Sequence, residues 1–159
     1  MLYDMKQSGN AELWVADELL ASPPDGFFGF GANGAARRGD DLYVINTDRG
    51  LIARIPIQKD GTAGEPTVYA EDPLLFGGDG LAFDVLGNLY VPRPFSFDLV
   101  RVTPCKTVES IVDFGDTLPF GTNIEFGVGR DSKTVFVWGR KFADSPFASR
   151  SKAETRGGS

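Results

Sequence analysis

The chain has 159 residues, of which 42% are hydrophobic and 24% charged, so it is long enough for one core and marginal for two domains. Its net charge of −6 argues against nucleic acid as a partner, because phosphate binding needs clustered lysine and arginine. The absence of histidine excludes the Ser-His-Asp triad, the Cys-His dyad and His-based zinc sites, which leaves carboxylates, Lys, Tyr, Cys or a metal-bound water for acid–base work.

The N-terminal region indicates no export signal and contains one predicted strand. Residues 1–20 carry several charges and no apolar signal-peptide core, and no later stretch approaches the ~18 apolar residues of a membrane span. The sequence therefore favours a cytoplasmic protein with no membrane partner. "AELWVADE", residues 11–18, is predicted to be one strand left from a preceding repeat, because Trp14 and Val15 favour a strand over a helix.

A repeated pattern occupies most of the rest of the chain. "GANGAARRGDDLYVINTDRGLIARIPI" (31–57) and "GGDGLAFDVLGNLYVPRPFSFDLVRVTP" (77–104) share a Gly-x-[Asn/Asp]-Gly opening, a short strand, a turn, Leu-Tyr-Val and a strand ending near a proline. "FGTNIEFGVGRDSKTVFVWGR" (120–140) is a weaker third copy. Each copy predicts short strands joined by tight turns, and no convincing helix is visible.

The spacing of this repeat predicts the fold class. Asn33 and Asp79 lie 46 residues apart, and Tyr43 and Tyr90 lie 47 apart. About four strands in a period of this length is the size of a propeller blade, whose sheet buries its faces against neighbouring blades. We therefore expect an all-β chain, with four antiparallel strands in each β-propeller blade. The predicted partial propeller covers 1–140, with about three blades near 31–76, 77–119 and 120–140, followed by a flexible tail at 141–159.

The quoted repeats resemble the SMP-30/gluconolactonase/LRE-like family, with the match running over about residues 12–138 in the order of that family's later half. The resemblance implies a six-bladed propeller with one divalent cation, usually calcium, in the central channel, and hydrolysis of lactones or related esters. A six-bladed ring needs roughly twice this length. The chain would thus be a fragment, a degenerate half-protein, or a half-propeller that a second copy completes as a homodimer.

The resemblance also implies site residues. Asn33 matches a metal ligand of the family, Asp79 matches a second ligand and proposed general base, and Thr122 and Asn123 match small polar groups facing the channel. The innermost strands of a propeller begin near the channel, so the oxygens of Asn33 and Asp79 would converge there, and such oxygens suit calcium. The cation would polarise a lactone carbonyl or acidify a water, whose proton Asp79 could accept. The alternative is that both residues only form turns.

Weaker candidates are also present. Asn46 and Asp48 are candidates for the lining of the channel mouth, or else belong to a polar hairpin. Asp84 is predicted to hold the turn before the strand at 89, and "PRPFSF" (92–97) either shapes a pocket wall or stiffens a loop. The family's early Glu ligand has no counterpart here, which favours a rival function: a non-catalytic propeller segment that acts in binding or self-association.

Overall fold

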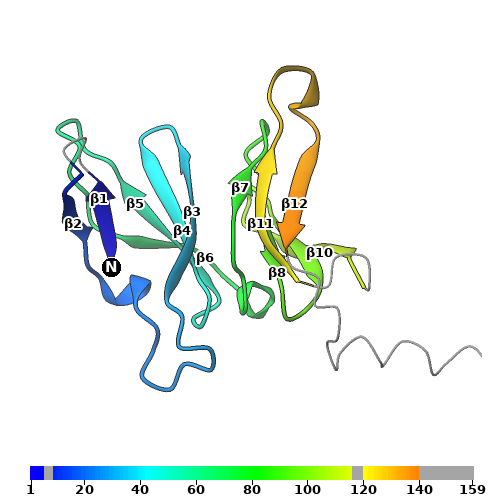
Figure 1. The fold of residues 1–159 in the computed structure, drawn as a ribbon, viewed down its shortest axis with the longest axis horizontal. Coiled ribbons are helices and arrows are strands. Elements are labelled where there is room, and N and C mark those ends of the chain that lie inside the picture. Colours follow the sequence, from blue (N-terminus) through cyan, green and yellow to red (C-terminus); the bar gives the residue numbers. More distant parts are fainter. Residues whose placement is uncertain (6–8, 116–119, 140–159) are drawn as a thin grey trace, which may run out of the picture.

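The computed structural model describes residues 1–5, 9–115 and 120–139, so the predicted tail at 141–159 lies outside it. Over these ranges the chain is all-β, and three single 3-10 turns are its helical elements. Along the chain the strands form a hairpin, two four-stranded antiparallel sheets and a second hairpin, placed side by side in Figure 1. The predicted fold class, four-stranded blades of a partial propeller, is confirmed.

The first four-stranded sheet has the spatial order of its sequence. Its strands are β3 (Ala32–Arg38), β4 (Asp41–Asn46), β5 (Leu51–Pro56) and β6 (Thr67–Glu71), in the order β3-β4-β5-β6. Successive side chains alternate between its faces, so Tyr43 and Ile45 pack on one side and Val44 on the other. Because both faces are covered, β4 and β5 are nearly continuous apolar runs rather than alternating ones.

The second four-stranded sheet repeats this plan. Its strands are β7 (Ala82–Phe83), β8 (Leu89–Arg93), β9 (Asp98–Val102) and β10 (Val108–Asp113). The predicted turn between β7 and β8 is confirmed, since Asp84 accepts hydrogen bonds from the backbone N–H groups of Leu86 and Asn88. The same carboxylate accepts the hydroxyl of Tyr90, which ties the turn to β8.

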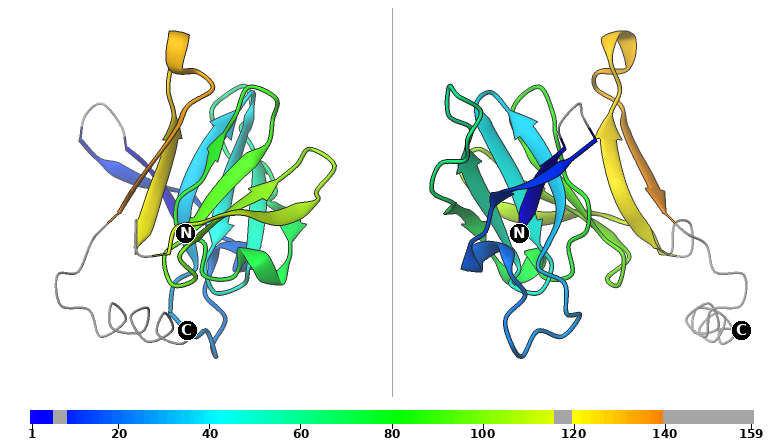
Figure 2. Two further views of the ribbon diagram at one scale, coloured as in Figure 1. Left: turned by 90° about the vertical axis from the view of Figure 1, so that its right-hand side faces the viewer. Right: turned by 60° about the vertical axis from the view of Figure 1, so that its left-hand side comes forward.

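A two-stranded hairpin stands at each end of the described chain. The N-terminal one pairs β1 (Leu2–Met5) with β2 (Ala11–Val15), and the last one pairs β11 (Gly121–Phe126) with β12 (Val135–Gly139). The sequence predicted a single strand at the N-terminus, to which the structure adds β1. The 3-10 turns are η1 (Glu18–Leu20), η2 (Pro73–Leu75) and η3 (Gly129–Asp131). In both views of Figure 2 the β11–β12 turn projects above the neighbouring sheets. None of the helical turns in the described ranges has the length and apolarity needed to cross a bilayer.

Three apolar clusters join each sheet to the next. The cluster between the two four-stranded sheets holds Ile45 and Ile52 of the first against Val91 and Val100 of the second. A second cluster lies between the first sheet and the N-terminal segment, and a third between the second sheet and the β11–β12 hairpin. Each sheet thus buries its faces against its neighbours, as the repeat predicted.

Equivalent aromatic pairs occur at two of these junctions. Tyr43 of β4 meets Phe83 of β7 edge to face, with ring centroids 4.8 Å apart. One repeat later, Tyr90 of β8 meets Phe126 of β11 in the same manner at 5.1 Å. Each such pair contributes about 0.5–1.5 kcal/mol beyond the burial of its area. Phe83 and Phe126 therefore pack between adjacent sheets.

The innermost segments of neighbouring sheets touch through their backbones. The N–H of Gly34 donates to the carbonyl of Asp79 at 2.8 Å, and the N–H of Gly80 donates to that of Thr122 at 3.0 Å. A Cβ on Gly34 would lie 2.5 Å from the Asp79 oxygen, so only glycine permits this approach. The Gly after Asn33 and the Gly after Asp79 therefore set the spacing between the sheets.

Replacing Gly80 with alanine is expected to destabilise the fold by about 1–3 kcal/mol, because the added Cβ would lie 2.9 Å from Cα of Asn123. Urea unfolding measures this change. Gly39→Ala is the comparison variant: Gly39 has open space around it and φ +61°, so it carries only the backbone cost of about 1–2 kcal/mol. A Gly80→Ala variant as stable as the wild type would contradict the close packing of the inner segments.

Candidate functional site

Asn33, Asp79 and Thr122 occupy the same register at one end of three adjacent innermost segments. The two backbone hydrogen bonds between Gly34 and Asp79 and between Gly80 and Thr122 fix this equivalence. The long loop from 16 to 31 lies at the same end of the molecule, opposite the β11–β12 turn (Figure 1). The repeat that the sequence showed is thus preserved in space at the residues predicted to form the site.

Asp79 is a half-buried carboxylate. Burial raises the pKa of its carboxyl above the ordinary value, and a hydrogen bond from the side chain of Asn33 lowers it in part. The backbone N–H of Asp79 donates to the carbonyl of Pro92 on β8, at 3.1 Å. The side chains of Asn33 and Asp79 are therefore in contact through the Asn33 amide N–H, and the carboxyl takes up a proton more readily than an exposed one. The predicted convergence of their oxygens on a cation stays a prediction.

Asn33 is exposed and is held by a residue that the sequence analysis missed. Its Nδ2 donates to Oγ1 of Thr47 at 3.2 Å, and that hydroxyl donates to the carbonyl of Gly78 at 2.8 Å. Thr47 is buried and follows β4 directly. The sequence had instead indicated its two neighbours, Asn46 and Asp48, as candidates. Thr47 orients the Asn33 amide so that its nitrogen faces inward, which leaves Oδ1 as the atom available to a ligand.

The two candidates on β11 differ in their surroundings. Asn123 is exposed, and its Oδ1 accepts the N–H of Ile124 at 2.9 Å while its backbone lies against Gly80. Thr122 is half-buried and offers its carbonyl to Gly80. The structure thus places both residues beside the Asp79 segment, and their predicted role facing a channel stays a prediction.

Asn46 is fully buried at the start of the β4–β5 turn. Its Nδ2 donates to the carbonyls of Leu19 and Ala21, both at 2.9 Å, and its Oδ1 accepts the N–H of Arg49 at 3.1 Å. All of these partners are backbone groups, so the amide fastens η1 to the first four-stranded sheet. These contacts match the predicted alternative, in which Asn46 belongs to a polar hairpin. A role for Asn46 in lining the channel stays a prediction.

Asp48 is buried and holds the long loop. Its carboxylate accepts the N–H groups of Phe28 and Phe30 at 2.7 and 2.8 Å and the hydroxyl of Ser22 at 2.7 Å. Burial on its own raises the pKa of Asp48, but these hydrogen bonds outweigh it and hold the pKa below its ordinary value. Like Asn46, this side chain is used within the protein, and its predicted place in the channel lining stays a prediction.

The oxygens of Asn33 and Asp79 match a divalent cation in kind but are too few to hold one alone. An amide oxygen and a carboxylate are hard oxygen ligands, which fit calcium in kind. They supply two of the roughly 6–8 oxygens that calcium takes, and one negative charge. Among the residues that the structure describes, no group of three or more His, Cys, Asp or Glu side chains could hold a metal. A calcium ion here would need further ligands from water, substrate or another chain.

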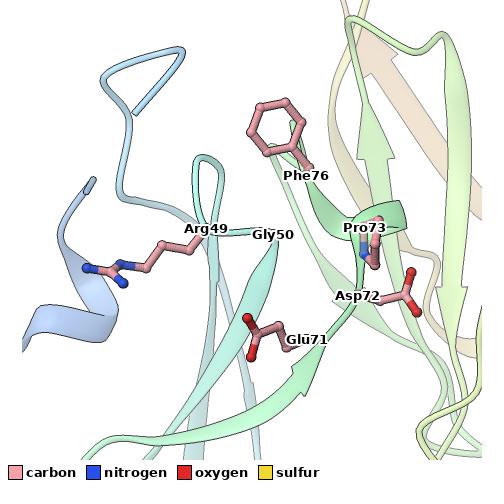
Figure 3. Close-up of a pocket in the computed structure, with 6 residues that line it drawn as sticks. All are labelled: Arg49, Gly50, Glu71, Asp72, Pro73 and Phe76. Carbon is pink, nitrogen blue, oxygen red and sulfur yellow. The ribbon is translucent and has the colours of Figure 1, made fainter. Parts of the chain in front are cut away.

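A pocket of about 460 Å³ lies apart from these residues. It is lined by Arg49, Gly50, Glu71, Asp72, Pro73 and Phe76 (Figure 3). Two of its charged groups are already used: Arg49 Nε donates to the carbonyl of Ala21, and Asp72 caps η2 by accepting the N–H of Leu74. None of the predicted ligands lines this pocket, so it lends no support to the metal site.

Five phenylalanines form a continuous chain of ring contacts, which we call the phenylalanine row: Phe27, Phe28, Phe76, Phe95 and Phe120. Phe28 lies at its centre, stacked on Phe95 with centroids 4.7 Å apart and 5.3 Å from Phe76. Phe95 in turn meets Phe120 edge to face at 5.0 Å. The row was not predicted from the sequence, because its members come from four separate segments of the chain. The segment 92–97, which carries Phe95, was predicted either to shape a pocket wall or to stiffen a loop.

Comparisons with known proteins show the fold. No family model matches the sequence, and no curated protein does. A luciferin-regenerating enzyme aligns with a TM-score of 0.59 at 15% identity, over 79% of this chain and 39% of the other. A gluconolactonase from Xanthomonas campestris aligns with a TM-score of 0.52 at 21% identity, over 68% and 34% of the two chains.

A virginiamycin B lyase from Staphylococcus aureus aligns as well, with a TM-score of 0.50 at 15% identity over 69% of this chain and 35% of that one. The described fold thus spans well under half the length of each of these structures. All three are β-propeller folds, and they include both a lactonase and a lyase. At these identities the similarity shows the fold alone: the sheets of the described chain have the arrangement of β-propeller blades.

Proposed function

We propose that the chain acts as part of a calcium-dependent lactone or ester hydrolase of the SMP-30/gluconolactonase type. The observation that carries this proposal is the pairing of Asn33 with a half-buried Asp79 whose carboxyl has a raised pKa. A carboxylate with a raised pKa is a better general base near neutral pH than an ordinary one. The aligned gluconolactonase supports the same reaction class.

In this proposal each residue has a separate task. Asp79 accepts a proton from the attacking water, and the Asn33 amide, oriented by Thr47, positions the substrate or cation through Oδ1. Bound calcium would supply the polarisation of the ester carbonyl. Because the chain spans a minority of each aligned propeller, a second copy or further blades would close the ring around this site.

A second candidate, a non-catalytic segment that binds or self-associates, is favoured by the apolar residues left on the two end hairpins. Tyr3 and Leu13 are exposed on β1 and β2, and Phe136 and Trp138 are exposed on β12. Large exposed apolar residues on both outer sheets are a typical feature of surfaces that pack against another chain. Self-association through these hairpins is compatible with the hydrolase and does not require it.

Thermal unfolding with and without calcium tests the proposed site. Calcium at about 100 times its Kd is expected to stabilise the folded chain by about 2.7 kcal/mol, which raises the melting temperature by roughly 5–10 °C. Asp79→Asn is expected to abolish this rise, because it removes the only carboxylate of the pair. Asp40→Asn, which removes an exposed carboxylate in the β3–β4 turn, is the matched control and should respond as the wild type does.

An equal calcium response in the wild type and Asp79→Asn, or none in either, would exclude the site. Light scattering on the same samples gives the mass in solution. A dimer would support a ring closed by a second copy, whereas a monomer would favour ring closure by blades outside this sequence. Dimerisation with no calcium response would instead support the non-catalytic candidate.

A further inference from the structure

The phenylalanine row leaves large apolar area in contact with solvent. Phe27 is 81% exposed and Phe95 is 53% exposed, although both touch other members of the row. A ring needed only for the core would be buried, as most large apolar residues of the central strands β4, β5, β8 and β9 are. Contiguous exposed apolar surface of this kind marks a place where something binds.

The row adjoins the candidate site along the chain and in space. A Cβ on Gly77 would lie 3.7 Å from the ring of Phe28, so the ring rests on the backbone two residues before Asp79. Phe120 precedes Thr122 by two residues and closes the other end of the row. The centre of the row therefore lies against the segment that leads into Asp79, so a ligand at Asp79 has the row beside it.

Polar side chains fix the two backbone segments that carry Phe28 and Phe95. The loop that carries Phe28 is fastened by the Asp48 carboxylate. The turn that carries Phe95 is closed by an ion pair between Arg93 and Asp98. Nε of Arg93 donates to Oδ1 of Asp98 at 2.8 Å, and Nη2 donates to Oδ2 in parallel. Both supports are more buried than the rings they carry, so the exposed rings are preorganised and a ligand has less motion to freeze on binding.

The same turn contains a strained residue. Phe97 has φ +57°, in the left-handed region that costs a bulky residue about 1–2 kcal/mol. Its carbonyl accepts the N–H of Phe114 at 2.7 Å, which ties the strained turn to the residue that follows β10. Such strain persists where the surrounding structure fixes the backbone, and it often accompanies functional loops.

We propose that the phenylalanine row binds the apolar alkyl or aryl substituent of a lactone or ester whose carbonyl lies at Asp79. This inference rests on the proposed function and names its substrate class. No member of the row carries a polar side-chain atom, so a polyhydroxylated ligand would lose hydrogen bonds to water there without replacement. An apolar chain would instead gain from burial against the rings.

The test uses the full chain and a series of γ-lactones whose side chain grows from methyl to hexyl. Dissociation constants are measured by calorimetry in Asp79→Asn, which removes the proposed base and so slows turnover. Each added methylene is expected to tighten binding two- to fourfold. Phe95→Ala is expected to reduce the gain in affinity to less than about 1.5-fold per methylene. Phe27→Ala, at the more exposed of the two rings, should do the same as a separate variant.

Phe136→Ala is the matched control, because Phe136 is 51% exposed, like Phe95, but lies on β12 outside the row. It should leave the chain-length dependence unchanged. Binding that is independent of chain length, or equal losses in Phe136→Ala and Phe95→Ala, would overturn the proposal. So would a dimer that Phe27→Ala converts to a monomer, because a second copy would then occupy the row.

These outcomes separate the proposal from the function on which it rests. Chain-length-dependent binding without hydrolysis by the wild type would reject the hydrolase and keep the row as an apolar-ligand site. Hydrolysis with the same kcat/KM for the methyl and hexyl lactones would keep the hydrolase and reject the row as its substrate site.

Discussion

Replacement of Asp98 by alanine is expected to destabilise the fold by about 3–5 kcal/mol, the largest effect on stability that we expect from one polar side chain. Asp98 is 7% exposed and pairs with Arg93, and it also accepts the hydroxyl of Ser110 at 2.8 Å. Its removal leaves the guanidinium of Arg93 buried without its carboxylate. Urea unfolding followed by tryptophan fluorescence or circular dichroism measures the loss.

The double variant Arg93→Met with Asp98→Leu is the control for this measurement. Replacing both partners of a buried ion pair by apolar residues of similar size is often neutral, because no charge is then left unpaired. We therefore expect the double variant to be more stable than Asp98→Ala. If the two variants were equally unstable, packing rather than the unpaired charge would explain the loss.

Asp79→Asn is expected to lower kcat/KM for lactone hydrolysis by about 10²–10⁴-fold, the usual contribution of a general base. The asparagine keeps the size of the side chain and removes its ability to accept a proton. A plot of log kcat/KM against pH should rise with the deprotonation of Asp79 in the wild type and lose this limb in the variant. Asp40→Asn should match the wild type, and a drop as large as that of Asp79→Asn would remove Asp79 from the mechanism.

Asp79→Asn is also expected to change the free energy of unfolding, because the pKa of Asp79 differs between the folded and unfolded states. Burial raises the pKa of Asp79 in the folded state above its ordinary value of 3.8, so the folded state holds the proton more tightly than the unfolded state. This contribution to stability is fully present below the unfolded pKa and is lost as the pH rises through the folded pKa. Without calcium, Asp79→Asn should therefore be more stable than the wild type at neutral pH.

The repeat made the sheets predictable because it recurs in both sequence and packing. Tyr43 and Tyr90 mark equivalent strands, and each meets a phenylalanine at the end of the first strand of the next sheet, Phe83 or Phe126. Strand β1 was not predicted, since Leu2–Met5 has no repeat partner and too few residues to show a period. A short strand of this kind is recognised only through its pairing with β2.

The candidate site was predictable where it followed the repeat and not elsewhere. Asn33 and Asp79 stand one period apart, so register alone brought them together. Thr47 was missed because its partners, Asn33 and Gly78, lie 14 and 31 residues away. The phenylalanine row was also missed, because Phe27 and Phe28 lie far along the chain from Phe76, Phe95 and Phe120. A phenylalanine is usually a core residue, and only the fold shows that these five meet.

The three apolar clusters give the molecule the energetics of a linear stack. Each cluster joins one sheet only to the next, so the free energy of unfolding is approximately a sum of terms for single sheets and for neighbouring pairs. In such a stack the central junction is supported from both sides, while each end hairpin is supported from one. Opening is therefore expected to begin at the ends and travel inward, which leaves the Asp79 segment, beside the central junction, among the last parts to separate.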